Sequence, residues 1–237
     1  MLKSASKILE ALSMLVPLVI VSIVILHFKD LLFSTFMKMN LGAASFLISF
    51  VASLSIVPIP STYILFSLVA LNKGLSYRLI VVMAITGGLG AALGEAVAWV
   101  IGKASGKVLE NTKYMEHISA LIKLINMWGY WAVALLVFIF AFTMLPDKLI
   151  YLPLGMMGYS LWKILPITIL GKILMLLVVL TAGKVMGDIL EEHPILSTEI
   201  TFLIMTLLLI AVMLLLIMID WSTIVLRIIE KRSTKAK

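Results

Sequence analysis

Four ionisable side chains lie within or directly beside apolar stretches of this chain. Glu95 lies inside one long apolar run, and Lys172 lies near the middle of another. Asp147 and Lys148 follow Pro146, between two shorter apolar stretches. A charged side chain in an apolar environment is costly unless it faces water, a partner charge or a ligand, so these residues mark a candidate site. We expect Glu95 to pair with Lys172 or to carry a proton.

Composition predicts a membrane protein. Of the 237 residues, 62% are hydrophobic and 13% are charged, and the mean hydropathy is +1.18. A soluble domain of this size would have too little polar surface, so we predict an all-α polytopic membrane protein with one integral domain, residues 1–237. The absence of cysteine excludes disulfides, cysteine metal sites and thiol nucleophiles. The formal charge of +7 is carried by basic residues that flank apolar runs, which is typical of topology signals rather than of nucleic-acid binding.

Proline breaks divide two of the apolar stretches into arms too short to span a bilayer. The first break contains Pro58 and Pro60, and the second contains Pro146. Proline removes a backbone donor inside a helix, so we expect each pair of arms to form a re-entrant hairpin, with one kinked span as the alternative. The predicted segments are transmembrane helices at 8–28, 78–102, 161–185 and 200–221, re-entrant hairpins at 41–71 and 127–158, an interfacial amphipathic helix at 103–126 and a basic tail at 227–237.

The two halves of the chain have a similar order of elements. Pro60-Ser61-Thr62 corresponds to Pro146-Asp147-Lys148, and a glycine-bearing span follows each hairpin. With both termini cytoplasmic, most basic residues fall on the inner side, as the positive-inside rule requires. The hairpins then enter from opposite sides. This predicts inverted repeats, each a re-entrant hairpin plus a transmembrane helix, with additional spans at the N- and C-termini and a binding site near the midplane.

Each hairpin's return arm is expected to begin at depth, with free N–H groups and partial positive charge directed inward. Ser61 or Thr62 can cap the first arm, and Asp147 the second. Two such helix N-termini suit an anion, phosphate in particular, and Lys148 and Lys172 add full positive charge.

Simpler roles stay open for the same residues. Glu95 can be only a structural partner of Lys172, Asp147 only a helix cap, and Lys148 a side chain that reaches the interface. The sequence has no visible nucleophile–base pair and no metal-ligand spacing. We therefore expect no enzymatic activity, no cofactor and no bound metal.

Small residues recur at every fourth position around Glu95, and this predicts a helix face that another backbone can approach closely. They are Thr86, Gly90, Gly94, Ala98, Gly102 and Gly106.

This stretch resembles a known family signature. The run Gly90-x-x-x-Gly94-Glu95-x-x-x-Trp99-x-x-Gly102-Lys103-x-x-Gly106 resembles the pattern G-x-x-x-G-D-x-x-x-Y-x-x-G-R-x-x-G of DedA membrane proteins, also called the VTT or SNARE-associated Golgi protein family. The segment Pro58-Ile59-Pro60-Ser61 is similar to that family's first hairpin, and residues 138–171 are similar to its second.

The resemblance implies two opposed re-entrant hairpins and lipid transport in the cell membrane. The implied partners are membrane lipids, either an anionic phospholipid or a polyprenyl phosphate, together with protons; a homo-oligomer is also compatible. Glu95 falls on the family's Asp position. The chain departs from bacterial members in having Ser53, Ser61 and Thr62 where they carry acids, and no arginine between Arg78 and Arg227. An uncoupled phospholipid scramblase and a non-transporting, membrane-organising protein are the alternatives.

Overall fold

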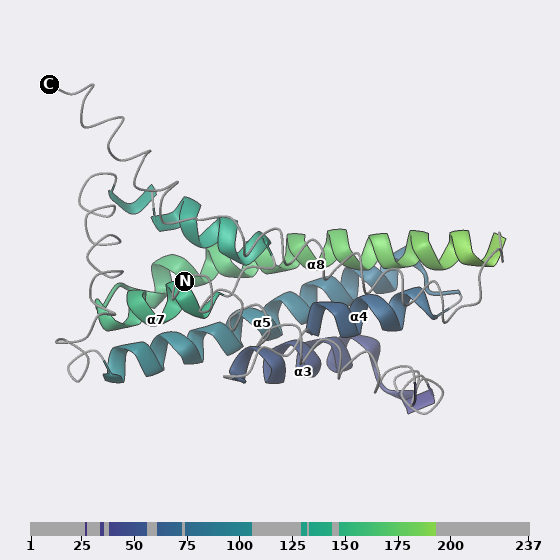
Figure 1. The fold of residues 1–237 in the computed structure, drawn as a ribbon, viewed down its shortest axis with the longest axis horizontal. Helices are drawn as coiled ribbons and strands as arrows, with labels where there is room; N and C mark the ends of the chain where they lie inside the picture. Colours follow the sequence, from purple (N-terminus) through teal and green to yellow (C-terminus); the bar gives the residue numbers. More distant parts are fainter. Residues whose placement is uncertain are drawn as a thin grey trace, which may run out of the picture.

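All of the regular elements that the structure describes are α-helices. The computed structural model describes residues 27, 34–35, 38–55, 61–72, 74–105, 129–131, 133–143 and 147–192. Its helices are α3 (Leu41–Leu54), α4 (Ser61–Ala70), α5 (Tyr77–Ser105), α7 (Lys148–Met156) and α8 (Leu161–Glu192), with a further apolar helix at Gly129–Phe142 (Figure 1). The predicted all-α class is confirmed for this part of the chain.

Two of the described helices, α5 and α8, are long and apolar enough to cross a membrane. With 29 and 32 residues, they extend about 43 Å and about 48 Å at 1.5 Å per residue, compared with a hydrocarbon core of about 30 Å. Residues 103–105, which the sequence assigned to an interfacial helix, instead continue α5. Figure 1 shows the two long helices side by side, with the short helices packed along them.

The transmembrane helix predicted at residues 161–185 is part of a longer helix, α8, which continues to Glu192. The ammonium of Lys184 pairs with Asp188 one turn later, and such a pair supports a helix. Gly187 also lies against the backbone carbonyl of Ala70 in α4. Contacts with another helix therefore stabilise the part of α8 that lies beyond the predicted span.

The first two short helices, α3 and α4, run in opposite directions. Residues later in α3 contact residues later in α5, and the same holds for α4 and α8. Each short helix is therefore parallel to the long helix on which it packs. The contact pairs are Gly42–Val82, Ser53–Gly94, Phe66–Gly183 and Ala70–Gly187. The long helices are antiparallel, because Gly88 lies against Ile173 whereas Trp99, further along α5, reaches Tyr159, earlier in the chain than Ile173.

In the second pair of short helices, the packing partners are exchanged: the first short helix packs on α8 and the second packs on α5. The helix Gly129–Phe142 runs parallel to α8, since the Tyr130 hydroxyl donates to the Lys163 carbonyl and Ala141 lies against Gly171. By contrast, α7 packs on α5, and its Gly155 lies against the backbone of Trp99.

Several predicted features lie outside the described residues. They are the spans at 8–28 and 200–221, the interfacial helix beyond Ser105, the tail at 227–237, the breaks Pro58, Pro60 and Pro146, and Gly106.

Candidate functional site

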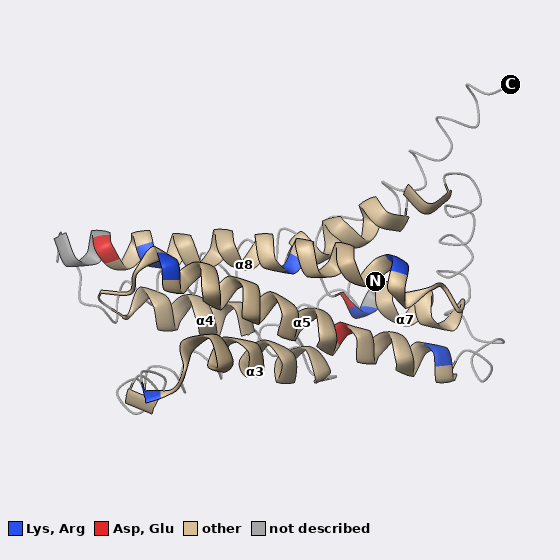
Figure 2. Ribbon diagram, turned by 180° about the vertical axis from the view of Figure 1, so that it is seen from behind, with Lys and Arg blue, Asp and Glu red and all other residues tan. Residues whose placement is uncertain are grey.

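Charged residues on the described helices gather at the two ends of the bundle and at one place between them, where α5, α7 and α8 meet (Figure 2). Three of the central residues are almost completely buried: as whole residues, Glu95 is 5%, Asp147 7% and Lys172 6% exposed. They lie between two apolar clusters. The α5 residues of the first cluster lie at or before Ala84, and those of the second cluster begin at Ala98. The site is thus a polar layer between two apolar layers.

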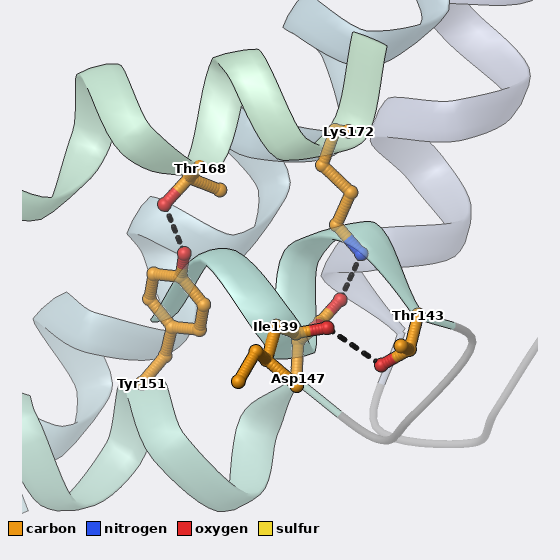
Figure 3. A network of polar contacts seen from close by, with 6 residues as sticks. All are labelled: Ile139, Thr143, Asp147, Tyr151, Thr168 and Lys172. Atoms are coloured by element: carbon orange, nitrogen blue, oxygen red, sulfur yellow. Dashed lines mark hydrogen bonds and ion pairs between the residues drawn. The ribbon is translucent and has the colours of Figure 1, made fainter. Parts of the chain in front are cut away.

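A buried ion pair joins α7 to α8. The Lys172 ammonium donates a hydrogen bond to Oδ2 of Asp147, as Figure 3 shows. The other carboxylate oxygen, Oδ1, has no hydrogen-bond partner among the described residues. The pairing of Lys172 with Glu95 that the sequence suggested is therefore replaced by a pairing with Asp147.

Asp147 does not cap α7 with its side chain, so that prediction is wrong. The residue occupies the N-cap position, but its backbone is helical (φ −57°, ψ −30°) and its carboxylate makes no capping hydrogen bond. A capping side chain needs an extended backbone to reach the first N–H groups. Here the main-chain carbonyl of Asp147 accepts from Ile150 and Tyr151, and the carboxylate is left for Lys172.

Glu95 lies close to this ion pair on α5. Its carboxylate is within electrostatic reach of Asp147 and Lys172, and the Ser53 side chain of α3 lies beside it. Its Oε2 atom has no partner in the described part of the chain. A carboxylate in such a place can take up and release a proton.

The small-residue face of α5 sets the position of Glu95, because it packs on α3 before this residue and on α7 after it. A Cβ atom at Gly90 would lie 2.3 Å from the Phe46 carbonyl oxygen of α3, and one at Gly102 would lie 2.3 Å from the Leu152 carbonyl oxygen of α7. Only glycine allows backbones this close. Glu95 lies between these two contacts, where α3 ends and α7 begins.

The remaining predicted site residues lie at the edge of this cluster or away from it. Lys148, the first residue of α7, is half-buried, and its charge acts on both carboxylates. Ser61 and Thr62 are half-buried at the start of α4, and within the described ranges neither hydrogen-bonds to the three buried charges.

Sequence reasoning missed two polar residues beside the ion pair. The hydroxyl groups of Tyr151 and Thr168 are hydrogen-bonded to each other (Figure 3). Their sequence signal is spacing, since Tyr151 follows Asp147 by four residues and Thr168 precedes Lys172 by four. Residues four apart share one face of a helix, so both could have been included as neighbours of the charges.

The arrangement offers two proton-accepting carboxylates and one buried cation. A group of three or more histidine, aspartate or glutamate side chains able to hold a metal ion is absent from the described residues. Comparisons with known protein families, with characterised proteins and with solved structures found no match to this chain.

Proposed function

We propose that this chain is a DedA-like membrane transporter that moves an anionic lipid carrier of the polyprenyl phosphate class across the bilayer, coupled to protons. The observation that carries this function is the buried Asp147–Lys172 ion pair beside Glu95. Among the described residues, one oxygen of each of the two carboxylates, Asp147 and Glu95, has no hydrogen-bond partner. Ionisable groups in apolar surroundings commonly form substrate sites or proton relays. A buried lysine is also the cation that a phosphate headgroup needs at this depth.

The ion pair suggests how the two movements are coupled. When Asp147 takes up a proton, Lys172 loses its negative partner and is free to bind the oxygens of a lipid phosphate. The first N–H groups of α7 add partial positive charge beside it. When the headgroup leaves, the proton leaves Asp147 and the pair forms again. Glu95 is the second proton-accepting group of the same site.

The order of helix contacts supports an inverted repeat with re-entrant hairpins. On α5, Gly90 and Gly94 meet α3, and Gly102 then meets α7. On α8, Gly171 meets the helix Gly129–Phe142, and Gly183 and Gly187 then meet α4. Each long helix thus packs on the first short helix of its own half and then on the second short helix of the other half, as two-fold related repeats would.

Exposed apolar side chains support a location within the bilayer. Leu135 of the helix Gly129–Phe142 is 58% exposed, as is Val178 of α8, and Val100 of α5 is 53% exposed. Such surfaces are suited to lipid contact. In this proposal the protein is a multi-pass protein of the cell membrane with cytoplasmic termini.

Reconstitution into vesicles tests the function. The movement of a fluorescent polyprenyl phosphate and of a fluorescent phospholipid is followed with and without a pH gradient. We expect only the polyprenyl phosphate to move, faster with the gradient, and Lys172→Met and Glu95→Gln each to stop it. Lys184→Met, a lysine of the same helix near its end, is the matched control and should transport normally.

Other outcomes identify the alternatives. Movement of both lipids without a gradient would indicate an uncoupled scramblase. Movement of neither lipid, by a protein that is folded in the vesicles, would leave a membrane-organising role. Full activity of both Lys172→Met and Glu95→Gln would remove these residues from the mechanism.

A further inference from the structure

Two buried polar contacts, one helical turn apart, connect α7 to α8. The first is the ion pair Asp147–Lys172, and the second is the hydrogen bond between Tyr151 and Thr168. Asp147 and Tyr151 are four residues apart in sequence, as are Thr168 and Lys172. The two contacts therefore form successive rungs between the helices, and Figure 3 shows them side by side.

The second rung is a neutral hydrogen bond with a defined direction. The Thr168 hydroxyl donates to the Ile164 carbonyl at 2.9 Å. A hydroxyl has one proton to donate, so the Tyr151 hydroxyl must be the donor to Thr168. Tyr151 and Thr168 are both 0% exposed. Neither group gains or loses charge when Asp147 or Glu95 takes up a proton, so this rung persists when the ion pair opens.

The first turn of α7 is held by these rungs together with Ile150 and Tyr151, which belong to the second apolar cluster. The later part of the helix is fixed by Leu154 in the second apolar cluster and by Gly155 against α5. The helix has only nine residues and contains Pro153, which cannot donate a backbone hydrogen bond. Once the ion pair opens, the Tyr151–Thr168 bond is the polar contact left between α7 and α8 among those found in the described residues.

We propose that Tyr151 and Thr168 are positioning residues that hold α7 on α8 while the Asp147–Lys172 pair is open. The opening of the pair during transport rests on the function proposed above. The role of this rung is to keep the first turn of α7 beside Lys172, so that the freed ammonium and the N–H groups of α7 face the same headgroup.

Hydrogen exchange of the reconstituted protein tests this role without any lipid substrate, so a failure of the transport proposal would leave the test intact. The open pair is mimicked by Asp147→Asn with Lys172→Met, which removes both charges. Tyr151→Phe is then made in the natural chain and in this open-pair background. Exchange of the α7 amides is compared with exchange of the α3 amides, which report on global unfolding.

We expect Tyr151→Phe to speed α7 exchange less than two-fold in the natural chain, because the ion pair still holds the helix. In the open-pair background we expect at least a ten-fold increase in α7 and no change in α3. Tyr63→Phe, which removes the hydroxyl of a buried tyrosine on α4, is the matched control and should leave α7 unchanged. The proposal would be overturned if Tyr151→Phe increased α7 exchange by the same factor in both backgrounds, or if it changed α7 exchange in neither.

Thr168 provides the second variant pair. In the open-pair background Thr168→Ser keeps the hydroxyl and should exchange like its parent, whereas Thr168→Val should match Tyr151→Phe. Fast α3 exchange would reveal that Tyr151→Phe unfolds the whole chain in the open-pair background. In that case the comparison of Thr168→Ser with Thr168→Val decides, again from α7 exchange relative to α3 exchange. Equal α7 exchange in the serine and valine variants would then overturn the role.

Discussion

Lys172 of α8 and Asp147, the residue before α7, form a buried ion pair, with side chains only 8% and 6% exposed. The chain also contains a partly exposed pair, Lys184–Asp188, in which the Asp188 side chain is 48% exposed. Both pairs join a lysine to an aspartate, but the first connects two helices and the second lies within one. Because the first pair is buried and the second is partly exposed, disrupting the first should reduce stability more than disrupting the second.

Removing one partner of the buried pair should destabilise the fold strongly. We expect Lys172→Met to lower the free energy of unfolding by about 3–5 kcal/mol, because it leaves an uncompensated buried carboxylate. Adding Asp147→Asn should recover part of that loss. Asp188→Asn should cost at most about 0.5 kcal/mol, the value of an exposed pair one turn apart. Denaturant unfolding in detergent measures all four proteins, and equal losses for Lys172→Met and Asp188→Asn would contradict this account.

Two glycines test the close approach of backbones. A Cβ atom at Gly102 would lie 2.3 Å from the Leu152 carbonyl oxygen, so α7 would have to move. We expect Gly102→Ala to destabilise by about 1–3 kcal/mol, as overpacking does. At Gly42 the nearest atom would be the Val82 side chain at 3.2 Å. There, alanine's helix propensity of about 1 kcal/mol should offset a small adjustment, so that stability changes little. Thermal unfolding of the two variants compares them directly.

Two serines of α3, one turn apart, should respond differently to alanine. The Ser45 hydroxyl donates to the Met83 carbonyl of α5 at 2.8 Å. The Ser49 hydroxyl is equally buried but has no partner in the described part of the chain. Ser45→Ala should therefore cost about 1 kcal/mol, whereas Ser49→Ala should be neutral or stabilising, since it removes an unsatisfied polar group. A greater loss for Ser49→Ala than for Ser45→Ala in the same unfolding measurement would show that Ser49 has a partner.

Trp99 connects α5 to the turn before α8. Its indole N–H donates to the Tyr159 carbonyl at 2.9 Å, and the Lys103 ammonium lies 5.2 Å from the ring centroid. We expect Trp99→Phe to lower stability by about 1–3 kcal/mol through the lost hydrogen bond and the smaller ring. Trp162 is 81% exposed, so Trp162→Phe should have little effect. Melting temperatures of the two variants in detergent provide the comparison.

The sequence alone determined the helical class and where the two long helices begin. An apolar run as long as that around Glu95 has few alternatives to a helix, because every backbone group must find a partner within the segment. The four-residue spacing of Gly90, Gly94 and Gly102 likewise indicated a face for close packing, since helical periodicity is a local property. These features depend on residues near one another in the chain.

The tertiary structure alone decided which charges meet. From the sequence, Lys172 could pair with either Asp147 or Glu95, and the separations along the chain do not show which of the two it meets. The choice of Asp147 over Glu95 follows from where α7 lies, and that is set by backbone contacts such as Gly102 with Leu152. Likewise, the continuation of α8 to Glu192 follows from its packing against α4. Register between helices depends on the shapes of both surfaces at once, so it cannot be read from either segment alone.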